Sequence, residues 1–206
     1  DPCPVDFHGF FDDAELGGDL FVERSRDHPC HDFALAAAHR FDPSEDPAQP
    51  GRGGNFLTVQ NRMYELVQFH FHRPSEERVN GRSFDMVAHL VHKDVEGRLA
   101  VVAVLLTRGA AQPVVQTVWN NLPLDRGREF SPDAVIDLAQ LVPADPGHFL
   151  YTGSLPTPPC TEDVLWVVMK QPLPIADDQL AVFARLYPRN GRPIQPANGR
   201  LLLESR

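Results

Sequence analysis

The sequence is poor in positive charge and has no long hydrophobic run. It holds 19 lysine and arginine residues against 28 aspartate and glutamate residues, which gives a formal net charge of −9. Lysine and arginine form no basic tract, so nucleic acid and anionic membranes are excluded as expected partners. No segment approaches the roughly 18 apolar residues of a membrane-spanning helix, and we therefore expect no membrane span.

Cysteine is also scarce. The three cysteines, Cys3, Cys30 and Cys160, form no C-x-x-C pair of the kind that builds thiolate zinc clusters or redox motifs. Two interpretations stay open: one disulfide with an odd thiol in an exported protein, or three reduced thiols in a cytosolic protein. The composition favours neither of them.

The residue pattern predicts a mostly β fold with a few short helices. Residues 1–53 are irregular and rich in Asp, Pro and Gly, which is typical of loops. Helices are expected at 131–142, where Ser131 and Pro132 suit a first turn, and at 177–186. The 20 prolines argue against a helical bundle. The length of the chain suits one domain, and we expect a single domain over 1–206 whose N-terminal segment, 1–53, is divergent. Strand-like runs of β-branched and aromatic residues lie at 56–59, 64–71, 84–92, 99–106 and 164–169.

Two histidines share one face of a predicted strand. Segment 67–72 reads Val-Gln-Phe-His-Phe-His, and successive side chains of a strand point to opposite faces. Gln68, His70 and His72 therefore share one face. Val67, Phe69 and Phe71 share the other. Two imidazoles about 7 Å apart along a strand can both reach one metal ion.

A third histidine follows across a predicted hairpin. Asn80-Gly81 favours a tight turn in which both central residues have positive φ, and the chain returns through 85–92. An antiparallel partner strand would place His89 beside the first two histidines, while His92 points to the opposite face. Three neutral imidazoles leave a fourth position of a zinc ion open for water, and zinc lowers the pKa of that water to about 7.

Three blocks of sequence resemble the α-carbonic anhydrase family. The first, within 68–93, reads QFHFH followed by PSE, VNG and HLVHK. The second, at 151–162, reads YTGSLPTPPCTE, and the third, within 186–200, reads LYPRNGRPIQP followed by NGR. The resemblance covers roughly residues 55–203 and implies a twisted, largely antiparallel central sheet with short flanking helices.

The resemblance also implies an activity and the residues that carry it. The family hydrates carbon dioxide reversibly to bicarbonate at a zinc ion, for which His70, His72 and His89 would be the ligands. Gln68 would orient His70 from behind, as ligand histidines usually require. Glu76 matches the carboxylate that accepts a hydrogen bond from a gatekeeping threonine. The apolar wall on which carbon dioxide rests would be Val91, Val101, Leu155 and Trp166.

One departure from the family pattern affects the active-site loop. Pro156 stands in the place of the first threonine of that loop, and proline has neither a hydroxyl group nor an N–H. Losing one oriented donor costs on the order of 3–4 kcal/mol in catalytic sites. Thr157 could take over the role only if the loop shifts by one residue.

Three further departures affect the surroundings of the zinc site. Val87 stands where the family usually has a glutamate that orients the third histidine, which predicts a less firmly held His89. Asn55 replaces the histidine that shuttles protons in many members, and Thr58 replaces a polar neighbour. The family's N-terminal motifs are not recognisable in residues 1–53.

The resemblance therefore implies a zinc-dependent carbonic anhydrase of lowered activity. The alternative is a related protein that keeps the fold and the metal but serves as a binding or structural module. The family pattern further implies a disulfide between Cys160 and an N-terminal cysteine, for which Cys30 is better placed than Cys3. Such a bridge implies a periplasmic or extracellular protein, and bacterial relatives often form homodimers.

Overall fold

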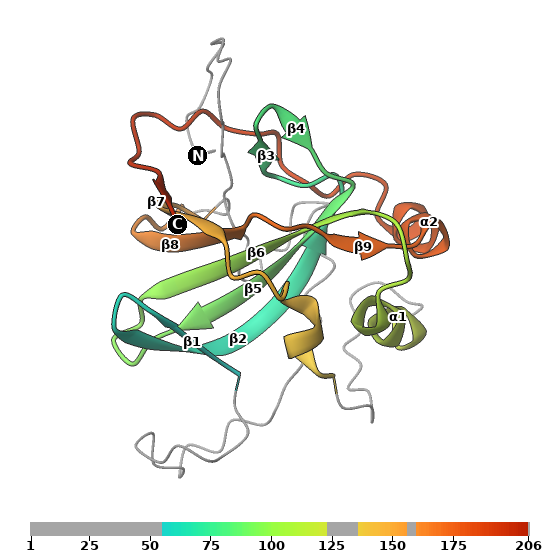
Figure 1. Ribbon diagram of the computed structural model, residues 1–206, viewed down its shortest axis with the longest axis horizontal. Helices are drawn as coiled ribbons and strands as arrows, with labels where there is room; N and C mark the ends of the chain where they lie inside the picture. Colours follow the sequence, from blue (N-terminus) through green and yellow to red (C-terminus); the bar gives the residue numbers. More distant parts are fainter. Residues whose placement is uncertain (1–54, 123–135, 156–159, 206) are drawn as a thin grey trace.

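The computed structural model describes residues 55–122, 136–155 and 160–205. In this part of the chain a curved sheet carries short helices on its flank (Figure 1). The strands are β1 (Phe56–Val59), β2 (Arg62–His72), β3 (Arg78–Val79), β4 (Arg82–Ser83), β5 (Met86–Lys93), β6 (Leu99–Arg108), β7 (His148–Gly153), β8 (Val164–Met169), β9 (Leu173–Ile175) and β10 (Leu203–Glu204). The helices are α1 (Pro113–Asn120), the 3-10 helix η1 (Leu138–Leu141) and α2 (Asp177–Leu186).

The main sheet has eight strands in the order β1-β2-β5-β6-β8-β7-β10, and β9 pairs with β6 beyond this path. Strand β6 runs parallel to β8 and β9, and the other pairs are antiparallel. The predicted mostly β, largely antiparallel architecture is thereby confirmed. Strands β1 and β8 have their predicted bounds, and the ends of β2, β5 and β6 lie within two residues of theirs.

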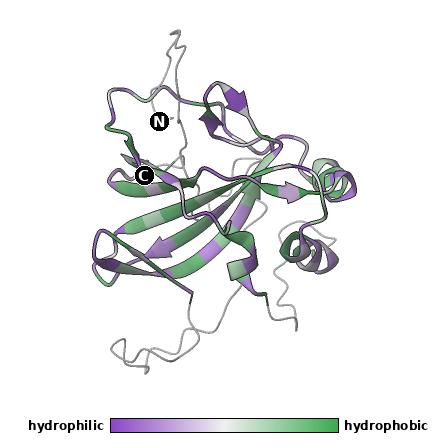
Figure 2. Ribbon diagram, in the orientation of Figure 1, coloured by the Kyte–Doolittle hydropathy of each residue, from purple (hydrophilic) through white to green (hydrophobic). Residues whose placement is uncertain are grey.

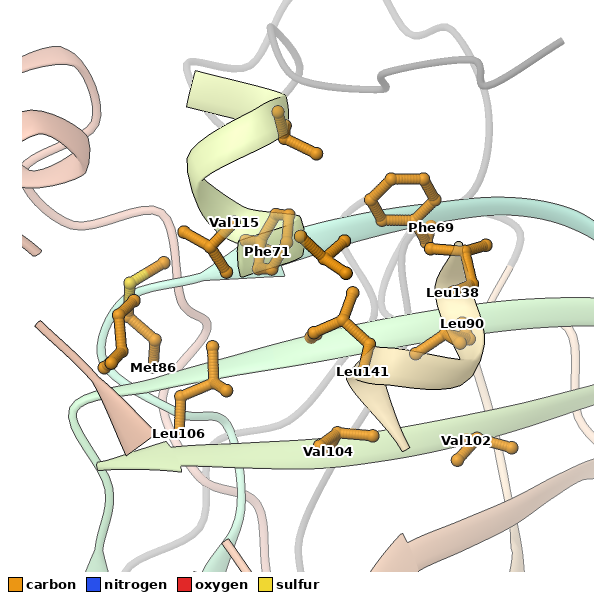
Figure 3. Close-up of a cluster of buried hydrophobic side chains, with 14 of the residues drawn as sticks. Phe69, Phe71, Met86, Leu90, Val102, Val104, Leu106, Val115, Leu138 and Leu141 are labelled. Carbon is orange, nitrogen blue, oxygen red and sulfur yellow. The ribbon is translucent and has the colours of Figure 1, made fainter. Parts of the chain in front are cut away.

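Alternating side chains give the sheet two buried faces, as the pleat of a strand requires. On one face Met86 and Leu90 of β5 join the larger apolar cluster, which α1 and η1 cover (Figure 3). On the other face Val87 and Val91 of the same strand join a second cluster. His89 has the parity of the second set and therefore lies on the face away from α1 and η1.

Strand β2 departs from strict alternation at one point. Its pairing with β5 shifts by one residue between Leu66 and Gln68, and the side chain of Val67 between them is 50% exposed. Val67 is thus exposed, unlike Phe69 and Phe71, with which it is predicted to share a face. The shift is a local bulge, which adds one residue to a strand and re-aims its neighbours.

The turn between the two histidine strands is the predicted one. Asn80 and Gly81 both have positive φ, 51° and 72°, as a two-residue hairpin loop of this kind demands. They join β3 to β4 in a small two-stranded sheet, which is hydrophilic in Figure 2 while the central strands β5 and β6 are mostly hydrophobic.

The helices agree only in part with prediction. The second predicted helix is confirmed as α2. In the described part of 131–142 only the single 3-10 turn η1 forms, so an α-helix there is wrong. Helix α1 was not predicted; Gln112 caps its first turn and Pro113 occupies its start. None of the described helices has the length and hydrophobicity that crossing a membrane requires.

Candidate metal centre

The three predicted ligands meet on one face of the sheet. His70 on β2 and His89 on β5 are directly paired residues, and His72 lies two residues further along β2. One ring nitrogen from each histidine can be chosen so that all three atoms lie within 4.8 Å of one another. The side chains are buried, with exposures of 5%, 5% and 0%.

One nitrogen of each imidazole is anchored by an oxygen atom. His70 Nδ1 lies 2.9 Å from Gln68 Oε1, and His72 Nδ1 lies 3.1 Å from the carbonyl oxygen of Asn190. His89 Nε2 lies 2.7 Å from a carboxylate oxygen of Glu77. Because each oxygen accepts a hydrogen bond, each anchored nitrogen carries the hydrogen of a neutral ring.

The remaining nitrogen of each ring is buried without a hydrogen-bond partner in the described part of the chain: His70 Nε2, His72 Nε2 and His89 Nδ1. A buried polar atom that stays unpaired costs free energy, so three such atoms gathered in one place require an explanation. One ring nitrogen from each of the three histidines lies within 4.8 Å of the other two, and imidazole nitrogen is a donor that zinc prefers. The residues present therefore fit the zinc ion that the sequence analysis expects.

Burial keeps the imidazoles of His70 and His72 uncharged. It lowers the pKa of His70 well below 6.5, and the neighbouring histidines lower it further. It lowers the pKa of His72 to about 3, with His89 adding to the effect. Since only neutral imidazole binds a metal ion, these two histidines can bind metal at neutral pH without first losing a proton.

The same burial predicts how the stability of the metal-free protein depends on pH. Burial lowers the pKa of His72 to about 3 and that of His92 to about 4, against about 6.5 in an unfolded chain. Below pH 6.5 the unfolded state therefore binds more protons than the folded state, and stability falls toward pH 4 by on the order of 1 kcal/mol per pH unit for each histidine. Above pH 7 this contribution is fully present.

Urea unfolding of chelator-treated protein at pH 7.5, 6.0 and 5.0 measures this dependence. His92→Asn serves as the comparison, because it removes one of the titrating groups without touching the three ligands. Its slope with pH should be smaller than that of the unmodified protein. A midpoint that stays constant from pH 7.5 to 5.0 would contradict the prediction.

A loop near the C-terminus fastens His72. The side chain of Asn190 accepts a hydrogen bond from Arg73 N at 2.8 Å. It also donates one to the carbonyl oxygen of Phe71 on β2. The next position, 191, requires glycine, because a Cβ there would lie 2.5 Å from the carbonyl oxygen of Pro74. The third block of the resemblance thus has a direct structural role at the site.

Glu76 lies beside the triad. Its side chain is only 2% exposed, its Oε1 accepts a hydrogen bond of 2.6 Å from Arg192 N, and the same oxygen lies 3.3 Å from His72 Nδ1. This places a fixed carboxylate next to the predicted ligands. Its expected partner in the active-site loop, whether Pro156 or Thr157 fills that place, lies outside the described residues.

The predicted apolar wall forms beside the triad. Its four residues belong to the second buried cluster and come from three strands and the loop after β7: Val91, Val101, Leu155 and Trp166. In the sheet Val91 pairs with Val101, and Val101 pairs with Trp166. The rings of Trp166 and His89 are 5.2 Å apart, edge to face, so the wall adjoins the third ligand.

Two residues that contact the predicted ligands, Glu77 and Asn190, are not predicted by the sequence pattern. Val87 predicts a poorly held third histidine, whereas the structure places the carboxylate of Glu77 against that ring. The Glu76-Glu77 pair beside the hairpin was the available signal. Asn190 acts on His72 from 118 residues away in the chain, a distance over which no strand or helix period gives a signal.

The other predicted site residues are only partly described. Asn55 and Thr58 are exposed at the edge strand β1, and Asn55 contributes its carbonyl oxygen to Leu66 N at 2.8 Å. Cys30 lies outside the described residues, so its pairing with Cys160 stays a prediction.

Comparisons with known proteins agree with this geometry. The model of the eukaryotic-type carbonic anhydrase family matches residues 45–206. A carbonic anhydrase of Nostoc sp. is 44% identical over 74% of this chain and 58% of its own length. One from Neisseria gonorrhoeae is 41% identical over 74% of this chain and 60% of its own. The structure of the α-carbonic anhydrase from Thermovibrio ammonificans superposes with a TM-score of 0.72 and 31% identity, covering 94% of this chain and 76% of that one.

A curved mixed sheet that presents three buried histidines on one face is an arrangement of the α-carbonic anhydrase type. The chain belongs to the eukaryotic-type carbonic anhydrase family. It spans about 60% of the length of the bacterial relatives named above.

Proposed function

We propose that the chain is a zinc-dependent lyase that hydrates carbon dioxide reversibly to bicarbonate. The observation that carries this proposal is the arrangement of the three histidines. Each ring is anchored through one nitrogen, and the other nitrogens are buried and without hydrogen bonds in the described structure. One ring nitrogen from each histidine lies within 4.8 Å of the other two. An apolar wall suited to an uncharged substrate lies next to them.

The residues of the site divide the work of this reaction. Zinc bound by three imidazoles supplies a nucleophile at neutral pH because it lowers the pKa of water. Gln68, Glu77 and Asn190 fix the ring orientations and keep the ligand nitrogens unprotonated. Val91, Val101 and Trp166 form a dry surface on which carbon dioxide can rest without displacing tightly bound water.

Two sequence features support a lowered rate. Pro156 removes the hydroxyl group and N–H that the family's loop threonine supplies. Asn55 does not titrate near neutral pH, so proton export depends on buffer or on another group. Neither change touches a metal ligand, and zinc binding itself is therefore expected to be intact.

Stopped-flow measurement of carbon dioxide hydration tests the proposal, on protein whose zinc content has been determined. The expected result is about one zinc per chain and turnover that chelation abolishes and added zinc restores. Turnover that survives complete zinc removal would refute the proposal. A protein that takes up no zinc would also refute it.

A second function is favoured by Pro156, namely a zinc-bearing relative that acts by binding rather than by catalysis. The two are separated by the same measurement. Stoichiometric zinc without any turnover above the buffer rate, at several buffer concentrations, would select the binding function. Turnover that rises with buffer concentration would select the enzyme with a missing proton shuttle.

We further propose an exported protein, periplasmic or extracellular, in which Cys30 and Cys160 form a disulfide. The family pattern supports this pairing, and a loop of roughly 130 residues would be worth about 4–5 kcal/mol in the chain-entropy model. Peptide mapping without and with reductant tests the disulfide, since only a real bridge links the two peptides.

The homodimers that bacterial relatives often form support a homodimer here, which sedimentation of the purified chain decides.

A further inference from the structure

The third histidine is oriented by a carboxylate from an unexpected place. Glu77 Oε1 lies 2.7 Å from His89 Nε2, and both side chains have an exposed fraction of 0%. An ionised carboxylate only accepts hydrogen bonds, so Nε2 carries the hydrogen and Nδ1 keeps its lone pair. Nδ1 is the atom of this ring that has no hydrogen-bond partner among the described residues. The contact thus selects the tautomer that can bind metal.

The position that the family uses for this purpose is apolar here. Val87 lies two residues before His89, is completely buried and packs in the second apolar cluster. In the sheet it pairs with His72, which places it in the immediate surroundings of the triad. This chain therefore has a carboxylate at position 77 and none at position 87. One carboxylate is enough to accept the single hydrogen bond from the ring of His89.

The backbone that carries Glu77 is fixed by the base of the hairpin. The hydroxyl group of Ser75 donates to the carbonyl oxygen of Glu77 at 2.9 Å and accepts from Phe84 N at 3.0 Å. Ser75 N also donates to the carbonyl oxygen of Phe84 at 3.2 Å. Supports of this kind let a side chain hold a ligand precisely oriented. Glu77 is therefore built into the site and does not reach it by chance.

The charge of Glu77 also fits a metal ion. A fully buried carboxylate requires a compensating positive charge, and no arginine or lysine ion pair to it is found within the described residues. Three neutral imidazoles would leave a bound divalent ion with its whole charge. A carboxylate behind one ligand offsets part of it and increases the basicity of that ligand.

We propose that Glu77 is the positioning residue for His89, and that it replaces, from the hairpin, the carboxylate that other members of the family carry at position 87. This inference rests on the proposed zinc site. Its consequence is that the Val87 departure does not weaken metal binding in this chain.

The test measures zinc affinity by competition with a chromophoric chelator, and the visible spectrum of the Co²⁺-substituted protein. E77A is expected to bind zinc about 10- to 100-fold more weakly, and E77Q, whose amide oxygen can still accept from Nε2, should fall between E77A and the unmodified protein. The Co²⁺ spectrum of E77A should change because the geometry of one ligand changes. Glu65→Gln is the matched control, since Glu65 is exposed on the same strand as two ligands.

A double variant provides the decisive comparison. E77A combined with Val87→Glu returns a carboxylate to the family position and should regain at least tenfold of the lost affinity. Urea unfolding of the metal-free proteins shows whether a loss of affinity is only a loss of folding, and E77Q and E77D give the readout where E77A does not fold. Zinc affinity and Co²⁺ spectra of E77A and E77Q that match the unmodified protein would overturn the inference alone. Failure of the unmodified protein to bind zinc would overturn the proposed function, and this inference with it.

Discussion

Replacing His70, His72 or His89 singly by alanine is expected to abolish carbon dioxide hydration and tight zinc binding. Zinc in four-ligand peptide sites binds with about 10–16 kcal/mol, so one ligand is worth roughly 2.5–4 kcal/mol. Its loss corresponds to a zinc site that is about 10²- to 10³-fold weaker. Equilibrium dialysis against a zinc buffer measures the affinity, and stopped-flow hydration measures the activity.

The metal-free forms of the His70 and His72 variants should fold nearly as well as the unmodified chain, whereas His89→Ala also leaves the buried carboxylate of Glu77 without its hydrogen-bond partner and should be less stable. Each substitution removes a ring whose metal-facing nitrogen is buried without a hydrogen bond in the described structure, which offsets part of the cost of the lost packing. Zinc should then raise the unfolding midpoint of the unmodified protein but not that of the variants.

His148→Gln is the matched control for these three variants. His148 lies at the start of β7, where its ring contacts the carbonyl oxygen of Pro146 at 2.8 Å. Among the described residues it belongs to no group of three potential metal ligands. It should keep full zinc and full activity. A triad variant that retained the zinc affinity of the control would show that the metal is held elsewhere.

The sheet and the ligand triad could be predicted because both follow from local periods. Alternation along 67–72 puts His70 and His72 on one face whatever the rest of the chain does. Asn80-Gly81 fixes the direction of return, and antiparallel pairing then brings His89 opposite His70. The exposure of Val67 is associated with a bulge, which a period of two does not reveal.

What holds the ligands could not be predicted in the same way. Glu77 and Asn190 act through contacts that depend on how the hairpin and the C-terminal loop fold back onto β2. The family pattern at position 87 predicts a less firmly held His89 and gives no signal of Glu77, whose carboxylate contacts that ring from another segment. Helix α1 was missed for a related reason: its short run of valines resembles a strand, and its cap residue Gln112 also bonds to Gln179 of α2, far along the chain.

Replacing Pro156 by threonine is expected to raise the rate of carbon dioxide hydration by about 10²- to 10³-fold. The proposed loss at this position is one oriented donor, worth on the order of 3–4 kcal/mol in catalytic sites. The receiving carboxylate is already in place, because Glu76 is buried and held by the backbone of Arg192. The gain should appear in kcat at unchanged zinc content, since none of the ligands or their anchors is altered.

Thr157→Ala, made alone and together with Pro156→Thr, shows which residue of the loop serves the site. If Pro156 is the limiting defect, Thr157→Ala has little effect in either background and the threonine at 156 alone raises the rate. The opposite pattern, no gain from Pro156→Thr and a large loss from Thr157→Ala, would mean that the loop has shifted by one residue so that Thr157 meets Glu76. That result would refute the proposed defect, and it would explain how a family member can keep its chemistry while carrying proline at the gatekeeper position.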